Sequence, residues 1–125
     1  MKTDIRKIIV VDDSKTSQMI TKSCLEICGL TDTEYLFAAD GIEALNRIQK
    51  EAIDIAVVDL NMPKMNGTEL LKHIKSDIKT VYIPVIILSS IINPKKENDL
   101  KALGAAFILK KPITPATFEP IIHQL

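Results

Sequence analysis

The side chains in this sequence that could do chemistry are aspartates, serines and lysines that follow directly after short apolar runs. They are Asp12 and Asp13 after 8–11, Asp40 after 35–39, Asp59 after 55–58, Ser89 and Ser90 after 85–88, and Lys110 and Lys111 after 107–109. If the runs are parallel strands, the residues after them meet at one edge of a sheet, where ligands bind. Clustered carboxylates raise one another's pKa, so a cation between them would stabilise the group. The pattern therefore predicts a cation site built on aspartates.

The ligand atoms available limit which cation could bind. The aspartates offer only oxygen, and the two histidines, His73 and His123, lie far apart in the sequence. Oxygen ligands favour Mg²⁺, with Mn²⁺ next, and the chain has no twelve-residue acidic loop of the kind that binds Ca²⁺. Beside such a cation the carboxylate of Asp59 can attack phosphorus and become an acyl phosphate. The cation, a lysine and a serine would then interact with the phosphoryl oxygens.

Each of these residues has a simpler structural explanation when it is taken alone. Asp13 or Ser14 could cap a helix, and Asp59 could be a turn residue before 61–63. The serines could be ordinary loop residues, and the lysines could be a solvated pair. None of these explanations accounts for their joint occurrence at the ends of successive apolar runs, and for that reason we favour a shared site.

The elements that would position these residues alternate along the chain. The runs are mostly apolar at every position, which suits parallel strands covered on both faces. Between and after them lie five amphipathic stretches. Their apolar residues are Ile20, Cys24 and Ile27; Ala44, Leu45 and Ile48; Leu70, Leu71, Ile74 and Ile78; Pro94, Leu100 and Leu103; and Phe118, Ile121, Ile122 and Leu125. Strand then helix, five times over, predicts an α/β domain with helices on both faces of one sheet, and periodicity leaves the strand order open.

Length and charge define the class of protein further. The chain has 125 residues, of which 46% are hydrophobic, and its 16 basic and 16 acidic residues cancel. This predicts one domain over 1–125, and the charge balance argues against a nucleic-acid groove or a membrane patch. The first apolar run, 8–11, is too short for a signal-peptide core or a membrane span, so we expect a cytoplasmic location.

In combination, these residues resemble the receiver domains of bacterial response regulators. The likeness is carried by 10–14 (VVDDS), 57–67 (VVDLNMPKMNG), 84–90 (PVIILSS) and the pair Lys111-Pro112. It runs from about Lys7 to the C-terminus and is greatest with single-domain regulators of the chemotaxis type. The resemblance implies a doubly wound, flavodoxin-like sheet of five parallel strands in the order 2-1-3-4-5, flanked by five helices.

The resemblance also implies the metal site and the phosphoacceptor. Asp59 would accept the phosphoryl group. Asp13 would bind Mg²⁺ directly, together with Asp59 and the backbone carbonyl of Asn61. Asp12 would act mainly through a metal-bound water.

The remaining roles concern the phosphoryl group. By the same resemblance, Lys111 would contact it, Ser89 would rotate inward to bond one of its oxygens, and the Lys111–Pro112 peptide bond would be cis. One position departs from the family, which usually has Tyr or Phe three residues before its lysine, where this chain has Ile108. Counting from Lys110 instead would place Phe107 there but would lose the Lys-Pro pair. We expect Asp59 to be phosphorylated despite this change. The change concerns instead the coupling between phosphorylation and an output surface.

The resulting hypothesis is a two-component signalling switch that catalyses only its own phosphoryl transfer and hydrolysis, rather than an enzyme. A histidine kinase or a phosphotransfer protein would donate the phosphoryl group. The downstream partner would bind the region 89–115, which is rich in lysines. These are Lys95, Lys96, Lys101 and Lys110, and they would equally suit a solvated face without a partner.

Two alternatives come from other classes. The first is a scaffold with the receiver fold that binds partners without phosphorylation, although such domains typically lose residues that this chain keeps. The second is a Mg²⁺-dependent phosphatase with an aspartyl nucleophile, which would need Asp-x-Asp after the first strand, where this chain has 12–15 (DDSK). Nucleotide binding is disfavoured because neither glycine-rich phosphate-binding motif is present.

Overall fold

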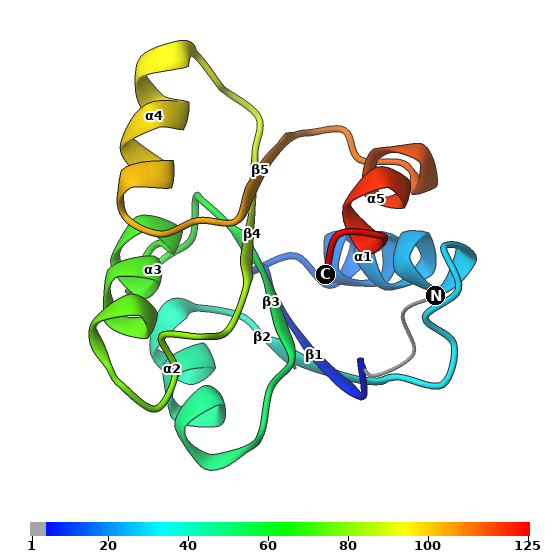
Figure 1. The fold of residues 1–125 in the computed structure, drawn as a ribbon, viewed down its shortest axis with the longest axis horizontal. Coiled ribbons are helices and arrows are strands. Elements are labelled where there is room, and N and C mark those ends of the chain that lie inside the picture. Colours follow the sequence, from blue (N-terminus) through cyan, green and yellow to red (C-terminus); the bar gives the residue numbers. More distant parts are fainter. Residues whose placement is uncertain (1–4) are drawn as a thin grey trace.

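The computed structural model describes residues 5–125, in which strands and helices alternate strictly. The elements are β1 (Lys7–Val11), α1 (Lys15–Ile27), β2 (Glu34–Ala38), α2 (Gly41–Lys50), β3 (Ile55–Asp59), α3 (Gly67–Ser76), β4 (Val85–Ser89), α4 (Pro94–Ala102), β5 (Phe107–Lys110) and α5 (Pro115–Ile122). Every strand pair is parallel, and the sheet has the order β2-β1-β3-β4-β5. Helices α2, α3 and α4 cover one face, and α1 and α5 cover the other (Figure 1). The fold class and the strand order are therefore confirmed.

The strands are apolar at nearly every position because both faces of the sheet are covered. Successive side chains of a strand point to opposite faces. In β1, Ile9 and Val11 join the hydrophobic cluster under α2 and α3, while Ile8 and Val10 join the cluster under α1 and α5. The two clusters hold the sheet between layers of helices, so the carboxyl ends of the strands are rigidly placed.

Polar caps start the helices at the edge of the sheet where the strands end. The side chains of Ser14, Asp40, Asn66 and Asn93 each accept a hydrogen bond from a backbone N–H in the first turn of the helix that follows. Such a cap stabilises a helix by about 1 kcal/mol. Because the helices start there, their N-termini surround the residues that follow the strands.

The predicted apolar stripes of α1, α3 and α4 are wrong in part. In α4, Pro94 is exposed at the start of the helix. In α1 the buried side chains are Gln18, Thr21, Cys24 and Leu25, whereas Ile20 and Ile27 are 47% and 71% exposed. The helix is turned by a position or two from the predicted orientation, so that Leu25 and not Ile27 enters the core. Ile78 lies beyond the end of α3 and is 88% exposed.

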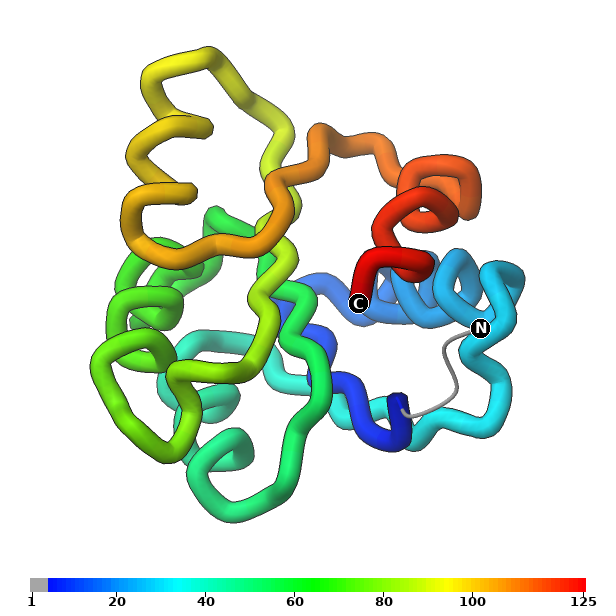
Figure 2. The backbone as a smooth tube through the Cα atoms, in the orientation of Figure 1, coloured from blue at the N-terminus to red at the C-terminus, as the bar shows by residue number. Residues whose placement is uncertain are grey.

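Helix α4 is the least anchored of the helices. Leu100 is its only buried residue, whereas α1 and α3 each bury four. The tube in Figure 2 shows α4, in yellow, standing out from the rest of the chain beyond β4 and β5. This part of the molecule is thus held by few apolar contacts.

No helix within residues 5–125 is long and apolar enough to cross a bilayer. The longest, α1, has 13 residues, and a spanning helix needs about 20 apolar residues.

Candidate phosphoryl and metal site

Three carboxylates meet at the carboxyl ends of β1 and β3. Asp12 and Asp13 follow β1 directly, and Asp59 is the last residue of β3. One oxygen from each carboxylate lies within 4.8 Å of the others. Asp12 and Asp59 are buried, while Asp13 is exposed, so the cluster opens to solvent on the Asp13 side.

Lys111 supplies the positive charge in this cluster. Its Nζ lies 3.2 Å from Oδ2 of Asp59 and 3.8 Å from Oδ2 of Asp12. The backbone N–H of Lys111 donates to the carbonyl of Ser89 at 2.9 Å, which fixes the start of this segment beside β4. Lys110 is exposed, so Lys111 is the lysine at the site, and the Lys111–Pro112 peptide bond is cis, as the resemblance implies.

Burial is the main influence on the charge of Asp12. Desolvation raises the pKa of its carboxyl above 3.8, and the nearby charges of Asp59 and Asp13 raise it further. The backbone N–H of Ser14, which donates to Oδ1 at 3.0 Å, and the ammonium of Lys111 oppose this shift. The predicted effect of clustered carboxylates is thus present at Asp12.

The donor set fits a hard divalent cation. The cluster offers carboxylate oxygens, with Asp13 exposed and able to reach an ion without further desolvation. Asn61 is the second residue of the loop after β3, and its backbone N–H donates to Oδ1 of Asp59 at 3.4 Å. Only oxygen ligands are present, which is the chemistry that Mg²⁺ and Mn²⁺ prefer.

Ser89 lies at the end of β4 but is bonded away from the carboxylates. Its side chain is buried, and its Oγ donates to the carbonyl of Ile91 at 2.9 Å. The same Oγ accepts from the backbone N–H of Ile91 at 3.3 Å. In this state the Ser89 hydroxyl therefore holds the loop that follows β4 in place through its hydrogen bonds to Ile91.

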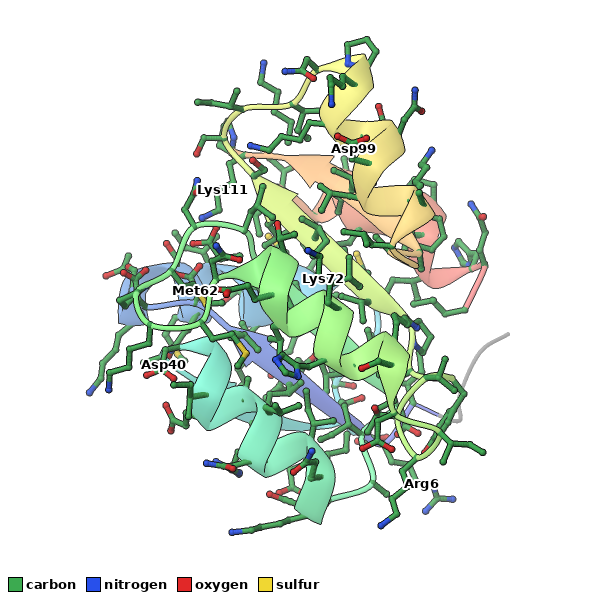
Figure 3. All side chains as sticks on the ribbon, turned by 90° about the vertical axis from the view of Figure 1, so that its left-hand side faces the viewer. Arg6, Asp40, Met62, Lys72, Asp99 and Lys111 are labelled. Atoms are coloured by element: carbon green, nitrogen blue, oxygen red, sulfur yellow. The ribbon has the colours of Figure 1, made fainter. Side chains whose placement is uncertain are left out.

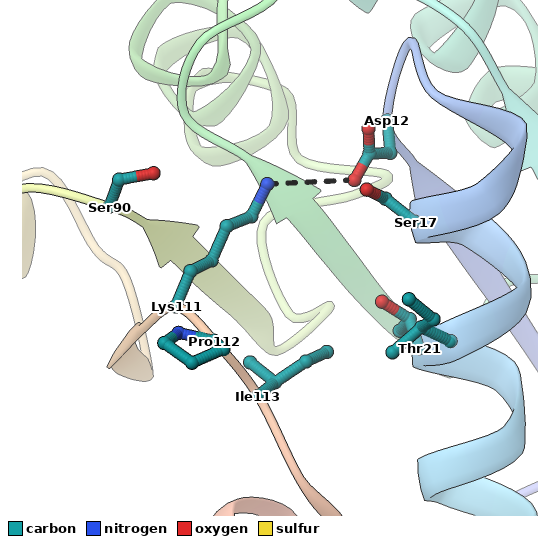
Figure 4. A pocket seen from close by; sticks show the side chains of 8 residues that line it. Asp12, Ser17, Thr21, Ser90, Lys111, Pro112 and Ile113 are labelled. Atoms are coloured by element: carbon teal, nitrogen blue, oxygen red, sulfur yellow. Dashed lines mark ion pairs between the residues drawn. The ribbon is translucent and has the colours of Figure 1, made fainter.

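A pocket of about 400 Å³ adjoins the cluster on the side of α1 and the segment after β5. Its lining residues are Asp12, Ser17, Ile20, Thr21, Ser90, Lys111, Pro112 and Ile113. Figure 4 shows Lys111 reaching from this segment to Asp12 across the mouth of the pocket. The space next to the carboxylates is thus polar at the ion pair and apolar around Ile20 and Ile113.

Sequence patterns missed two residues that support the cluster. Gln18 is buried, and its Nε2 donates to the backbone carbonyl of Asp12 at 2.7 Å. Gly41 donates its N–H to the carbonyl of Met65, in the loop after Asp59, at 3.0 Å. Gln18 has no sequence signal, whereas Gly41 lies next to Asp40, which the sequence predicts only as a residue that follows a strand.

The position of the family's aromatic residue is occupied by an aliphatic side chain. Ile108 is partly buried and packs against the cluster under α2 and α3, while Phe107 packs against the cluster on the opposite face. Phe107 therefore packs against the core on the face opposite to the one on which Ile108 lies.

Known proteins share both the sequence pattern and the fold. Residues 8–123 match the response regulator receiver domain family. The chain is 36% identical over 121 residues to the chemotaxis protein CheY-3 of Vibrio cholerae, covering 95% of this chain and 90% of the relative. It is 36% identical over 112 residues to the chemotaxis protein CheY1 of Helicobacter pylori, covering 87% of each.

Solved structures agree with this assignment. The structure of the chemotaxis protein CheY4 of Vibrio cholerae superposes with a TM-score of 0.84 at 32% identity, covering 96% of this chain and 98% of the other. The Mn²⁺-bound form of the response regulator Rcp1 has the same fold, with a TM-score of 0.77 at 24% identity, covering 95% and 90%. Receiver domains are phosphorylation switches of two-component signalling rather than classical enzymes, and a histidine kinase is their phosphodonor. This chain belongs to the response regulator receiver domain family.

Proposed function

We propose that Asp59 is the phosphoacceptor of this receiver domain and that residues 1–125 act as one phosphorylation switch. The observation that carries the proposal is the position of Lys111 Nζ, 3.2 Å from the buried carboxylate of Asp59. A carboxylate held between an ammonium and further carboxylates can attack phosphorus when a cation offsets the added charge. The same ammonium would then pair with a phosphoryl oxygen.

Asp13, Asp59 and the backbone carbonyl of Asn61 would hold Mg²⁺, or Mn²⁺ in its place. Asp12 would act through a water molecule, as the family resemblance implies. One of its oxygens accepts the N–H of Ser14, and the other lies 3.8 Å from the ammonium of Lys111. When bound, the cation would offset the negative charge of the phosphoryl oxygens. The Mn²⁺-bound state of Rcp1 is a precedent for such an ion in a protein of this fold.

In the transfer step, one oxygen of Asp59 forms a bond to phosphorus while the bond between phosphorus and the donor's histidine nitrogen breaks. The electron pair of that bond stays on the donor's imidazole ring. The attacking atom is a carboxylate oxygen, so the step needs no general base to activate Asp59. Hydrolysis later returns the free carboxylate and inorganic phosphate.

Ser89 would connect this event to the surface. To bond a phosphoryl oxygen, its hydroxyl would give up its two hydrogen bonds with the backbone of Ile91. Without these hydrogen bonds, loop 90–93 would shift. This movement does not require an aromatic side chain at position 108, where the chain has Ile108.

The region 89–115 would bind the downstream partner. Helix α4 lies in it and buries only Leu100, so it can move at small cost. Lys95 and Lys101 form ion pairs within the helix, with Asp99 and Glu97, so positive charge alone does not define the surface. A cytoplasmic location, where the kinase domain would act, completes the proposal.

The test is to incubate the protein with Mg²⁺ and acetyl phosphate and to measure intact masses. We expect wild type to gain one phosphoryl group only when Mg²⁺ is present, and Asp59→Asn to gain none. Asp99→Asn, which changes an exposed aspartate on α4, is the matched control and should behave as wild type. A wild-type chain that neither gains mass nor binds Mg²⁺ in a titration would instead support the phosphorylation-independent scaffold.

A further inference from the structure

Loop 60–66 follows Asp59 and carries Asn61, and it is closed at its base by backbone contacts. The N–H of Gly67 donates to the carbonyl of Leu60 at 3.0 Å, which brings the two ends of the loop together. Asn66 and Glu69 form a capping box at the start of α3, which fixes the exit of the loop. The two ends of the loop are thus held by contacts at the start of α3. These contacts do not support the part of the loop that faces away from α3.

The first turn of α2 provides that support through Gly41. This residue is buried, and its N–H donates to the carbonyl of Met65 at 3.0 Å. A Cβ at this position would overlap the Met65 carbonyl oxygen and would lie 2.7 Å from the Met65 Cβ. Real Cβ atoms do not come this close to such atoms, so any other residue at 41 would push the loop or the helix away. The glycine is required for space rather than for an unusual backbone angle.

An ion pair links the same two segments one residue earlier in each. The Nζ of Lys64 lies 3.8 Å from Oδ2 of Asp40, whose side chain is 14% exposed. Lys64 has φ of 58°, in the left-handed region that non-glycine residues rarely adopt. Oδ1 of Asp40 meanwhile accepts the N–H of Glu43 and caps α2. Figure 3 shows Met62, in this loop, beside the end of α2 that carries Asp40.

We propose that Gly41 and Asp40 are positioning residues that hold loop 60–66 in the conformation that binds the divalent cation. The inference rests on the proposed function, because it concerns the loop that would supply the Asn61 carbonyl. Gly41 holds the loop at Met65, and Asp40 holds it at Lys64. Neither residue is expected to touch the ion. They act on affinity by keeping the backbone carbonyl of Asn61 where the carboxylates of Asp13 and Asp59 can share an ion with it.

The experiment is a calorimetric titration of the metal-free protein with MgCl₂, repeated with MnCl₂, for wild type and three variants. Gly41→Ala should weaken Mg²⁺ binding about tenfold, the scale seen when residues behind metal ligands are changed. Asp40→Ser keeps a good helix cap but removes the ion pair with Lys64, and should weaken binding by a smaller factor. Ile48→Val lies further along α2, is 3% exposed in wild type and should leave affinity unchanged.

A second readout separates positioning from general damage. At saturating Mg²⁺, Gly41→Ala should take up phosphoryl groups from acetyl phosphate at nearly the wild-type rate, because excess cation offsets the weaker site. Thermal unfolding in EDTA should show Ile48→Val destabilised without any change in Mg²⁺ affinity. If Gly41→Ala does not fold, Asp40→Ser still decides the question.

Three outcomes are distinguishable. Weaker Mg²⁺ binding in Gly41→Ala and Asp40→Ser, with wild-type affinity in Ile48→Val, supports the inference. Wild-type affinity in both Gly41→Ala and Asp40→Ser overturns it while leaving the phosphoacceptor proposal intact. Absence of Mg²⁺ binding in wild type overturns the inference together with the proposed metal site.

Discussion

Loop 60–66 and loop 90–93 each follow a strand that ends in a residue of the site, but they are fastened in different ways. Loop 60–66 is held by two backbone hydrogen bonds, from Gly67 to Leu60 and from Gly41 to Met65, and its methionines pack against the core. Loop 90–93 follows Ser89, whose hydroxyl is bonded to the backbone of Ile91, and the Ile91 side chain is 66% exposed. One loop is fixed by backbone and core contacts. The other is held at its start by the Ser89 hydroxyl, which phosphorylation would recruit, and at its end by the Asn93 cap of α4.

The difference explains how one site can both bind and signal. A cation and a phosphoryl group need preplaced ligands, which the fixed loop provides beside Asp13 and Asp59. A signal needs a segment whose position depends on the phosphoryl group, and a loop whose start is held by the Ser89 hydroxyl meets that need. Helix α4 follows loop 90–93 and buries only Leu100, so this helix can move together with the loop.

The largest expected effect comes from breaking the fixed loop. In Gly67→Ala, the new Cβ would lie 2.7 Å from the carbonyl oxygen of Asp59 and 2.8 Å from Cα of Leu60. Forcing atoms into such a space costs about 1–3 kcal/mol of folding free energy. Urea unfolding should show this loss, whereas Ile91→Ala in the other loop should change stability by less than about 0.5 kcal/mol. Equal losses for the two variants would remove the contrast between the loops.

A gain in stability is expected from Asp12→Asn in metal-free buffer. The pKa of Asp12 is raised above 3.8 by burial, so the stability it contributes is present below pH 3.8 and is lost as the pH rises through the raised value. Asparagine has no charge to desolvate, can still accept from Ser14, and leaves Lys111 paired with Asp59.

Urea unfolding across the acidic and neutral range checks this prediction. The stability advantage of Asp12→Asn over wild type should be smallest near pH 3.8 and should grow toward neutral pH. Mg²⁺ binding should weaken in the same variant. An advantage that shrinks as the pH rises would mean that the charge of Asp12 stabilises the fold.

The smallest effect is expected from Ser89→Ala, which removes the fastening of loop 90–93. Losing the bonds to Ile91 should cost about 1 kcal/mol and should speed amide exchange in 90–93 without phosphorylation. Phosphoryl uptake at Asp59 should persist. Ser90→Ala, an exposed neighbour, is the control and should change neither quantity. Unchanged exchange in Ser89→Ala would show that other contacts hold this loop.

Much of the fold could be predicted from sequence because the local patterns are strong. The five apolar runs are the observed strands to within a residue or two, and alternating elements require parallel pairing. The strand order came from the family resemblance, since periodicity carries no information about which strands are neighbours. The orientation of α1 was missed because Gln18 and Thr21, which are polar, occupy buried positions while Ile20 and Ile27 are exposed.

At the site, residue types were predictable and their contacts were not. Asp12, Asp13, Asp59 and Lys111 lie together because each stands at the carboxyl end of a strand, which the apolar runs in the sequence predict. The bond from Ser89 to Ile91 depends on a side-chain rotamer. The contact of Gly41 with Met65 depends on how closely two loops approach, which no local pattern encodes.

The most direct test of the account is hydrogen–deuterium exchange of the wild-type protein with Mg²⁺, before and after phosphorylation by acetyl phosphate. The amide of Ile91 and its neighbours in loop 90–93 should exchange faster once Asp59 is phosphorylated, because Ser89 leaves them. The amides of Gly41 and Gly67, which hold loop 60–66, should stay equally protected. Faster exchange at Gly41 and Gly67 with no change in 90–93 would contradict the account.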